Sequence, residues 1–228
     1  AMDPQQRVLL EATWECLESS GYAGDALAGT RTGVFVGASY THLRDDLCRR
    51  GADLFDAHGI LGSQNAILSN RVSTFFDLRG PSLTVDTLCS SSFVALHLAA
   101  ESLRRDECAT ALVAGIHVGM SAPYYVALSR VQAISPRGRC RTFDRTADGY
   151  VPGEGVGVVL LKPLRKALED RDQIHAVIRG VAVNHDGQGL GLTIPNPECQ
   201  AAVIRSALAD AELRTSDLDY VEAHGTGD

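Results

Sequence analysis

The sequence contains no long hydrophobic run and no block of like charge. Its aliphatic stretches are short, as in VVLL at 158–161, whereas a membrane-spanning helix needs about 20 apolar residues. Lys and Arg never exceed a pair, and the formal net charge is -7, so a general affinity for nucleic acid phosphate is not expected. The first residues also lack the layout of a secretory signal. We therefore expect a soluble, cytoplasmic protein without a nucleic acid or membrane partner.

Paired cysteines are also lacking. The six cysteines stand at positions 16, 48, 89, 108, 140 and 199, so no two form a CxxC pair, and nothing indicates a secreted disulfide framework. A structural zinc site needs ligands at short spacing, and the seven histidines are equally scattered. We expect no metal, and we expect most of the cysteines to be buried thiols.

What the sequence does contain is a regular alternation of apolar strands and amphipathic helices. With 228 residues, 45% of them hydrophobic, the chain can bury a sizeable core. Strands are predicted at 32–37, 82–87, 109–115, 157–161, 176–183 and 220–223, and helices at 5–20, 89–105 and 197–211. This order predicts an α/β fold whose sheets are covered on both faces.

Three details of that prediction can be checked residue by residue. Gly21 is placed to end the first helix. The helix at 89–105 is expected to carry Phe93, Leu96, Ala100 and Leu103 on its apolar face. The polar stretch 134–155 is too long to be a simple connection, which indicates a functional loop.

The strongest signal for chemistry is the segment VDTLCSSSF at 85–93. A cysteine between a strand and a helix has its sulfur beside unpaired backbone N–H groups and the positive end of the helix dipole, which favour the thiolate. Cys89 is therefore a candidate nucleophile. The alternative is a small buried thiol, because free cysteine is among the most buried residue types, but three successive serines favour the site.

One histidine has surroundings typical of a site. His224 follows a predicted strand and precedes Gly-Thr-Gly, which lets backbone and substrate approach closely; on these residues alone, site and structural roles are equally favoured. His97 would lie about 12 Å from Cys89 along a shared helix, too far for a hydrogen bond. His185, in NHDG, is typical of a turn. The remaining histidines, at 42, 58, 117 and 175, have no neighbours that indicate a role.

Other templates do not match. The sequence has no GxSxG elbow of a serine hydrolase. The glycine-rich stretches at 153–157 and 187–191 fit neither the dinucleotide fingerprint nor the P-loop. We therefore expect no permanently bound cofactor. Arg137, Arg139, Arg141 and Arg145 in the long loop could meet an anion, although solvated loop charge is the commoner explanation.

Taken together, DTLCSSS, GRCRTFDRTADGYVPGEGVGVVLLK, NHDG, GLTIPNP and EAHGTG, in this order, resemble the β-ketoacyl synthase domain of a modular polyketide synthase. The resemblance extends from MDPQQR across essentially the whole chain. It implies a thiolase-like, layered αβαβα fold, usually in a homodimer. It also implies that Cys89 is the acyl-accepting nucleophile and His224 the first of two active-site histidines.

The reaction implied by the resemblance has two halves. Cys89 takes an acyl chain from the phosphopantetheine arm of an acyl carrier protein, and the thioester is then attacked by the carbanion left when a carrier-borne malonyl group loses CO₂. The developing enolate needs aimed hydrogen-bond donors, and His224 would be one. The backbone N–H of Cys89 would be a first donor to the tetrahedral oxyanion.

The sequence departs from the family pattern in several places. Asp228 stands where the family has Thr, and Leu88 stands where Ala is commoner. The family's first strand, its lysine-containing block with the second histidine, and its Gly/Phe loop are not in the sequence. We therefore expect a fold incomplete at both ends, with 1–163 supplying most of the N-terminal half and 164–228 the start of the C-terminal half, and a chain that is catalytically incomplete alone.

Two further interpretations stay open. The chain could belong to a non-elongating relative that serves for carrier-protein docking or dimer scaffolding, or, less favoured by the SSS and VPGEG segments, to a fatty-acid-type condensing enzyme or thiolase relative. Carrier proteins are usually acidic, as is this chain, so docking needs a local basic patch. The candidates are Arg137, Arg139, Arg141 and Arg145.

Overall fold

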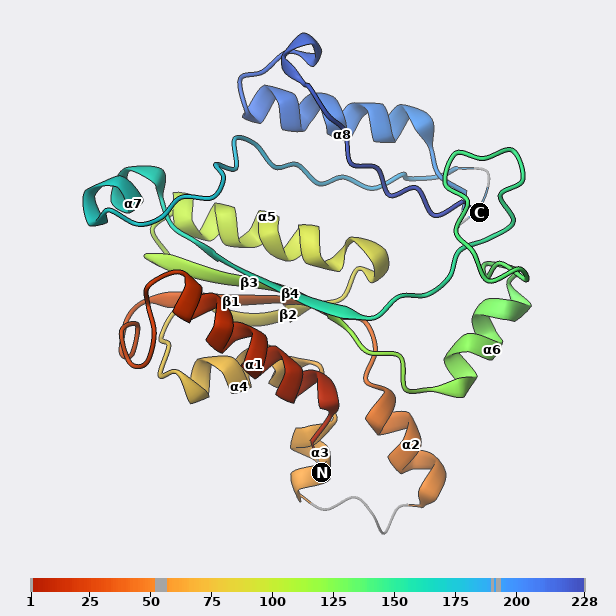
Figure 1. Cartoon of the computed structure of the whole chain (residues 1–228), viewed down its shortest axis with the longest axis horizontal. Coiled ribbons are helices and arrows are strands. Elements are labelled where there is room, and N and C mark those ends of the chain that lie inside the picture. The colour runs from red at the N-terminus through yellow and green to blue at the C-terminus, as the bar shows by residue number, and fades with distance from the viewer. Residues whose placement is uncertain (1, 52–56, 190, 192–193, 228) are drawn as a thin grey trace.

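The computed structural model describes residues 2–51, 57–189, 191 and 194–227 of the chain. Its strands form a four-stranded sheet with the order β2-β1-β3-β4 (Figure 1). β1 pairs in parallel with both β2 and β3, whereas β4 runs antiparallel to β3. The strands are β1 (Thr32–Gly37), β2 (Ser82–Val85), β3 (Thr110–His117) and β4 (Gly155–Leu161). The α/β prediction is confirmed, and β1 has the predicted bounds.

Helices cover both faces of this sheet (Figure 1). α1 (Pro4–Ser19) and α4 (Ala66–Phe75) lie on one face, and α5 (Ser91–Arg104) lies on the other. Because successive side chains of a strand point to opposite faces, β1 contributes to two cores. Val34 and Val36 belong to the core on the α1 and α4 side, while Phe35 packs with Ala95 and Ala99 of α5.

Local signals define both ends of α1, and the sequence predicts the second of them. The Asp3 carboxylate accepts a hydrogen bond from the Gln5 N–H at 2.8 Å, and Pro4 occupies the first turn, where a missing N–H costs nothing. At the other end Gly21 has φ +79°, a conformation that glycine adopts readily. Its predicted role as a helix stop is confirmed.

The other helices lie mostly in connections. The connection from β1 to β2 contains α2 (His42–Arg50), α3 (Ala57–Gly62) and α4. Two helices, α6 (Ala122–Arg130) and α7 (Leu164–Asp170), were not predicted from the sequence. α8 (Pro197–Asp210) matches its prediction, and single 3₁₀ turns occur as η2 (Leu88–Ser90) and η3 (Thr215–Asp217). In the part of the chain that the structure describes, no helix combines the length and apolar character needed to cross a bilayer.

Two predicted strands do not form. The segments 176–183 and 220–223 run beside α8 (Figure 1) but belong to no sheet among the described residues. A β-rich sequence needs a neighbouring strand to complete its backbone hydrogen bonds. In 176–183 a side chain takes that place, because the Val181 N–H donates to the Asp210 carboxylate at 2.9 Å. The prediction of strands here is wrong.

The predicted apolar face of α5 is also wrong. Phe93 is 70% exposed, and the buried positions are Ser91, Ala95, Ala99 and Ser102. Small side chains on this face let the helix lie close to the sheet, so packing selects them over the larger residues. A similar correction applies to β4, whose residues alternate between exposed and half-buried instead of being covered on both faces.

Candidate active site

Cys89 lies in the short connection between β2 and α5, on the 3₁₀ turn η2. This connection follows the carboxyl ends of the parallel strands, the edge at which open α/β sheets bind their ligands. Two glycines let the start of α5 approach that edge. A Cβ on Gly37 would collide with the backbone of Ser92, and one on Gly115 would lie 2.8 Å from the Ser92 Cβ. The predicted strand-to-helix junction is confirmed, and the sheet holds it firmly.

The serines around Cys89 stabilise the turn. The Ser91 hydroxyl donates to the Leu88 carbonyl at 2.6 Å and accepts from the Thr87 N–H at 2.9 Å. The Ser90 hydroxyl donates to the Thr87 carbonyl at 2.9 Å. Leu88 has φ +54°, which is uncommon for a residue other than glycine and is typical of strained positions at functional sites. The turn therefore holds a strained backbone directly before the cysteine.

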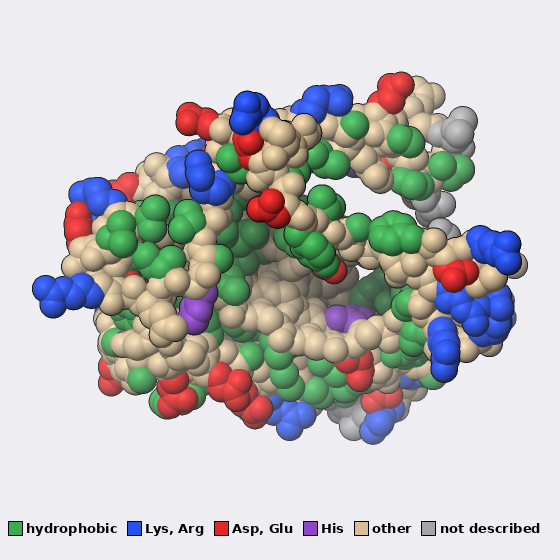
Figure 2. All heavy atoms as spheres, turned by 45° about the horizontal axis from the view of Figure 1, so that its top comes forward, with side chains coloured by type: hydrophobic (Ala, Val, Ile, Leu, Met, Phe, Trp, Pro, Cys, Tyr) green, Lys and Arg blue, Asp and Glu red, His purple; other side chains and the backbone are tan. Residues whose placement is uncertain are grey.

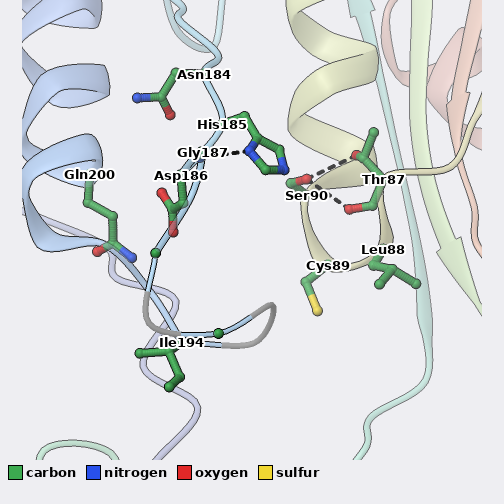
Figure 3. A pocket seen from close by; sticks show the side chains of 12 residues that line it. Thr87, Leu88, Cys89, Ser90, Asn184, His185, Asp186, Gly187, Ile194 and Gln200 are labelled. Atoms are coloured by element: carbon green, nitrogen blue, oxygen red, sulfur yellow. Dashed lines mark hydrogen bonds between the residues drawn. The ribbon is translucent and has the colours of Figure 1, made fainter.

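Cys89 is exposed and opens into a cavity of about 540 Å³ (Figure 3). One wall is the turn itself, from Thr87 to Ser90, and the other is the loop that leads into α8 together with the start of that helix. That second wall contributes Asn184, His185, Asp186, Gly187, Gly189, Gly191, Ile194 and Gln200. The volume is in the range of small-molecule sites. The thiol is thus reachable from solvent.

The other cysteines do not share this environment. Cys108 is the one buried thiol, Cys16 and Cys199 are half-buried, and Cys48 and Cys140 are exposed without lining this cavity. The expectation that most cysteines are buried is therefore wrong. Burial raises the pKa of the Cys16 and Cys108 thiols above the ordinary value, which disfavours their reaction as thiolates.

The loop opposite Cys89 is held by its own polar side chains. The Asn184 amide donates to the Cys199 carbonyl at 2.7 Å, and the Asp186 carboxylate accepts from the Asn196 N–H at 2.9 Å. The Asn196 side chain also caps α8. His185 Nδ1 accepts from the Gly187 N–H at 2.8 Å, which confirms its predicted place in a turn. The structure adds that the same imidazole lines the cavity.

His224 lies in the C-terminal segment and is exposed. The glycines after it are anchored to the long loop, because the Gly225 carbonyl accepts from the Thr142 hydroxyl and the Gly227 carbonyl accepts from the Gly149 N–H at 3.0 Å. Among the described residues that line the cavity, His185 is present and His224 is not. The structure therefore brings Cys89 together with His185. Asp228 lies outside the described residues.

A partly buried cluster of aromatic and imidazole side chains lies near Cys89, and it was not predicted from the sequence. Tyr40, His42, His117 and Tyr124 pack with ring centroids 4.7 to 6.0 Å apart. Burial lowers the pKa of both imidazoles and raises the pKa of Tyr124 to about 12. Cys89 contributes a smaller part of the raised pKa of both tyrosines. The residues come from two segments far apart in the sequence, 40–42 and 117–124, so only the fold reveals the cluster.

The arginines of the long loop divide into two kinds. Arg137 forms an ion pair with Asp148 at 2.5 Å and donates to the Thr146 carbonyl, and Arg141 is half-buried. Arg139 and Arg145 are exposed. Figure 2 shows Lys and Arg side chains gathered at the right end of the molecule, where Figure 1 places this loop. A basic patch exists there, but one of its four members is neutralised by a carboxylate.

The fold and the site define an α/β protein with an exposed cysteine on a strained turn at the carboxyl edge of a mostly parallel sheet. Residues 1–167 match the family model "Beta-ketoacyl synthase, N-terminal domain", and residues 175–228 match "Beta-ketoacyl synthase, C-terminal domain". The chain belongs to the β-ketoacyl synthase family.

Curated relatives are polyketide synthases. The chain is 50% identical over 228 residues to a phenolphthiocerol/phthiocerol polyketide synthase of Mycobacterium tuberculosis, covering 99% of this chain and 12% of that protein. It is 46% identical to polyketide synthase ThaG of Burkholderia thailandensis, covering 99% of this chain and 4% of that protein. The chain thus spans a small part of these relatives.

Solved structures show the same architecture. The oxazolomycin ketosynthase domain OzmH KS7 of Streptomyces albus JA3453 aligns with a TM-score of 0.92 and 44% identity, covering 99% of this chain and 39% of that one. The ketosynthase from module 6 of the bacillaene synthase of Bacillus subtilis 168 aligns with a TM-score of 0.91 and 34% identity, covering 99% and 38%. The predicted thiolase-like fold is confirmed.

Proposed function

We propose that this chain carries the acyl-accepting nucleophile of a polyketide-synthase ketosynthase, and that the nucleophile is Cys89. The observation that carries the proposal is the exposed thiol on a strained turn at the cavity mouth. Membership of the family supports the reaction type, a decarboxylative condensation of an acyl group with a malonyl-type extender. The substrates arrive on the phosphopantetheine of an acyl carrier protein, and no permanently bound cofactor is needed.

In the first half of the reaction, the acyl group moves from its thioester on the carrier protein to a new thioester on Cys89. Its Sγ attacks the carbonyl carbon of the acyl group, a new carbon–sulfur bond forms, and the bond to phosphopantetheine breaks, so that the carrier leaves with a free thiol. The tetrahedral oxyanion requires donors held in place beforehand. The hydroxyls of Ser90 and Ser91 form hydrogen bonds to neighbouring groups of the turn and hold it in place. The backbone N–H of Cys89, which lies on this turn, is therefore suited to the role.

In the second half, His224 donates a hydrogen bond to the enolate oxygen that develops as malonyl loses CO₂. Two features support this assignment. The imidazole is exposed and therefore accessible to a carrier-borne substrate, and the glycines after it are fixed to the loop at 142–149. The proposal also includes a homodimer and docking of the carrier protein at Arg139 and Arg145, the two exposed arginines of the basic patch.

Transfer of an acyl group from a loaded carrier protein tests the proposal. Intact-mass spectrometry should show one added acyl group on the 228-residue chain, and Cys89→Ala should abolish it. Cys48→Ala and Cys140→Ala are matched controls, because both cysteines are exposed elsewhere, and both should retain transfer. His224→Ala should also retain this first half-reaction.

Two results would change the assignment. Acylation that survives Cys89→Ala would overturn the nucleophile. Acylation of Cys89 without any carbon–carbon bond formation in the polyketide synthase that contains this sequence would favour the non-elongating docking module instead.

A further inference from the structure

His185 is the imidazole among the described residues that line the cavity of Cys89, and neither the family resemblance nor the half-reactions above assign it a role. Figure 3 shows its imidazole extending from the loop wall toward the turn that carries Ser90 and Cys89. The loop behind it is braced by the Asn184 and Asp186 hydrogen bonds. The imidazole is therefore presented to the cavity from a fixed backbone.

The hydrogen bond to Gly187 determines which nitrogen of His185 carries the proton. Nδ1 accepts from the Gly187 N–H at 2.8 Å, so in the neutral ring the proton must be on Nε2. Nε2 is the nitrogen on the side of the ring away from Gly187, toward the Ser90 turn (Figure 3). A neutral His185 thus offers a hydrogen-bond donor, and no acceptor, to whatever occupies the cavity.

The other residues that line the cavity are compatible with an acyl chain that carries an oxygen atom. The Asp186 carboxylate accepts from the Asn196 N–H, and the Asn184 amide nitrogen donates to the Cys199 carbonyl, so both side chains already have a partner beside the loop. Leu88 and Ile194 supply apolar surface on opposite walls. A hydrogen-bond donor in a cavity that has apolar surface on both walls suits an acyl chain that carries one oxygen.

We propose that His185 is a specificity-determining residue whose Nε2–H donates to an oxygen at C3 of the acyl chain on Cys89, so that 3-hydroxy and 3-oxo chains are accepted faster than fully reduced ones. The inference rests on the proposed function, because a condensation leaves an oxygen at C3 of its own product. Chains passed on without complete reduction therefore retain the group that His185 recognises.

Two substitutions separate recognition from loop structure. In His185→Asn the shorter side chain keeps an acceptor for the N–H two residues on, as Asn does in an Asx turn, but it loses the distant donor. In His185→Phe both the acceptor and the donor are lost. His175→Asn is the matched control, since His175 is exposed and does not line the cavity.

The experiment measures the rate of Cys89 acylation by 3-hydroxybutyryl and by butyryl N-acetylcysteamine thioesters, followed by intact mass. We expect the wild-type chain and His175→Asn to prefer the hydroxylated chain by about threefold to tenfold, the size of effect that one net hydrogen bond gives. We expect both His185 variants to lose this preference while butyryl transfer is retained in His185→Asn.

Each other outcome has a definite meaning. Equal wild-type rates for the two thioesters, or a preference that survives in His185→Asn, would overturn the role of His185. Equal slowing of both thioesters in His185→Asn would also overturn it, because His185 would then act on the part that the two probes share. If neither thioester acylates Cys89 although iodoacetamide does, the proposed function itself fails.

Discussion

Residues 2–170 and residues 171–227 differ sharply in how they use their apolar side chains. The first region contains two buried apolar cores, one on each face of a sheet, whereas in the second Ala211 is the one buried apolar residue among those described. Ile178, Val183, Ile204 and Val221 are all more than 40% exposed, and Figure 2 shows green side chains along α8 and the segments beside it. Apolar composition alone therefore does not make a core.

A segment with a strand-like sequence thus forms a strand only where a neighbouring segment completes its backbone hydrogen bonds. β1 forms because β2 and β3 flank it on both sides, while 176–183 has a comparable sequence and no ladder partner among the described residues. Yet the second region supplies one wall of the Cys89 cavity. The first region thus holds Cys89 in place. The second region, which buries few apolar side chains, lines the cavity through which a substrate approaches Cys89.

The largest expected effect tests the contrast in packing. Phe35→Ala removes a side chain that is 2% exposed at the centre of the sheet and should lower the free energy of unfolding by about 3–5 kcal/mol. Val221→Ala, at a position 72% exposed, should change it by less than about 0.5 kcal/mol. Urea denaturation measures both. Equal losses would mean that the second region is packed as tightly as the first.

A smaller effect is expected where the sheet meets the turn of Cys89. Gly37→Ala places a Cβ against the backbone of Ser92, so α5 must shift, at a cost of about 1–3 kcal/mol. The shift should also slow alkylation of Cys89. Gly157→Ala is the matched control in β4, because nothing lies within 4 Å of its added Cβ. Unchanged Cys89 reactivity in Gly37→Ala would show that the turn does not depend on this contact.

The imidazoles of His42 and His117, one buried and one half-buried, predict a pH dependence. Burial lowers the pKa of His42 and His117 below the ordinary 6.5, so below that pH the unfolded chain binds more protons than the folded one. Their contribution to stability is complete above about pH 6.5 and is lost progressively as the pH falls.

We expect the urea midpoint to decrease as the pH is lowered from about 7.5 to about 5.5. The decrease should be smaller in His117→Phe. His175→Phe, at an exposed position in the second region, should keep the wild-type dependence. A pH dependence that is identical in all three proteins would rule out this cluster as its cause.

The smallest expected effect is at the contact between the two regions. Arg104 of α5 pairs with Asp210 of α8 at 2.8 Å, and the same carboxylate accepts from the Val181 N–H. Asp210→Asn should leave the urea midpoint unchanged and raise the hydrogen exchange of the Val181 amide. Glu169→Gln, which breaks a pair within α7, should change neither. A lowered midpoint in Asp210→Asn would show that the second region contributes to global stability.

Much of the first region could be predicted from local patterns. The caps of α1, the bounds of β1 and the junction at Cys89 each depend on residues adjacent in sequence, such as Asp3, Pro4 and Gly21. The apolar face of α5 was not predictable from periodicity, because Gly37 and Gly115, far away in sequence, set the close approach that excludes Phe93 from the interface.

The sequence predicts the nucleophile of the candidate site but not the cavity around it, because only the nucleophile depends on residues adjacent in sequence. Cys89 is identified by its own neighbours, whereas the cavity forms from two segments far apart in the sequence, 87–90 and 184–200. His185 was assigned to a turn correctly, but its second role depends on the opposite wall. The cluster of Tyr40, His42, His117 and Tyr124 could not be predicted, because it joins the segments 40–42 and 117–124, which only the fold brings together.

The central claim is that one thiol of six is the acyl acceptor, and peptide mapping after exposure to a limiting acyl thioester tests it most directly. Cys48 and Cys140 are internal standards, because they are exposed like Cys89 but do not line the cavity. The account predicts that the acyl group accumulates on Cys89 while these two stay largely unmodified. Equal acylation of the three exposed cysteines would contradict it.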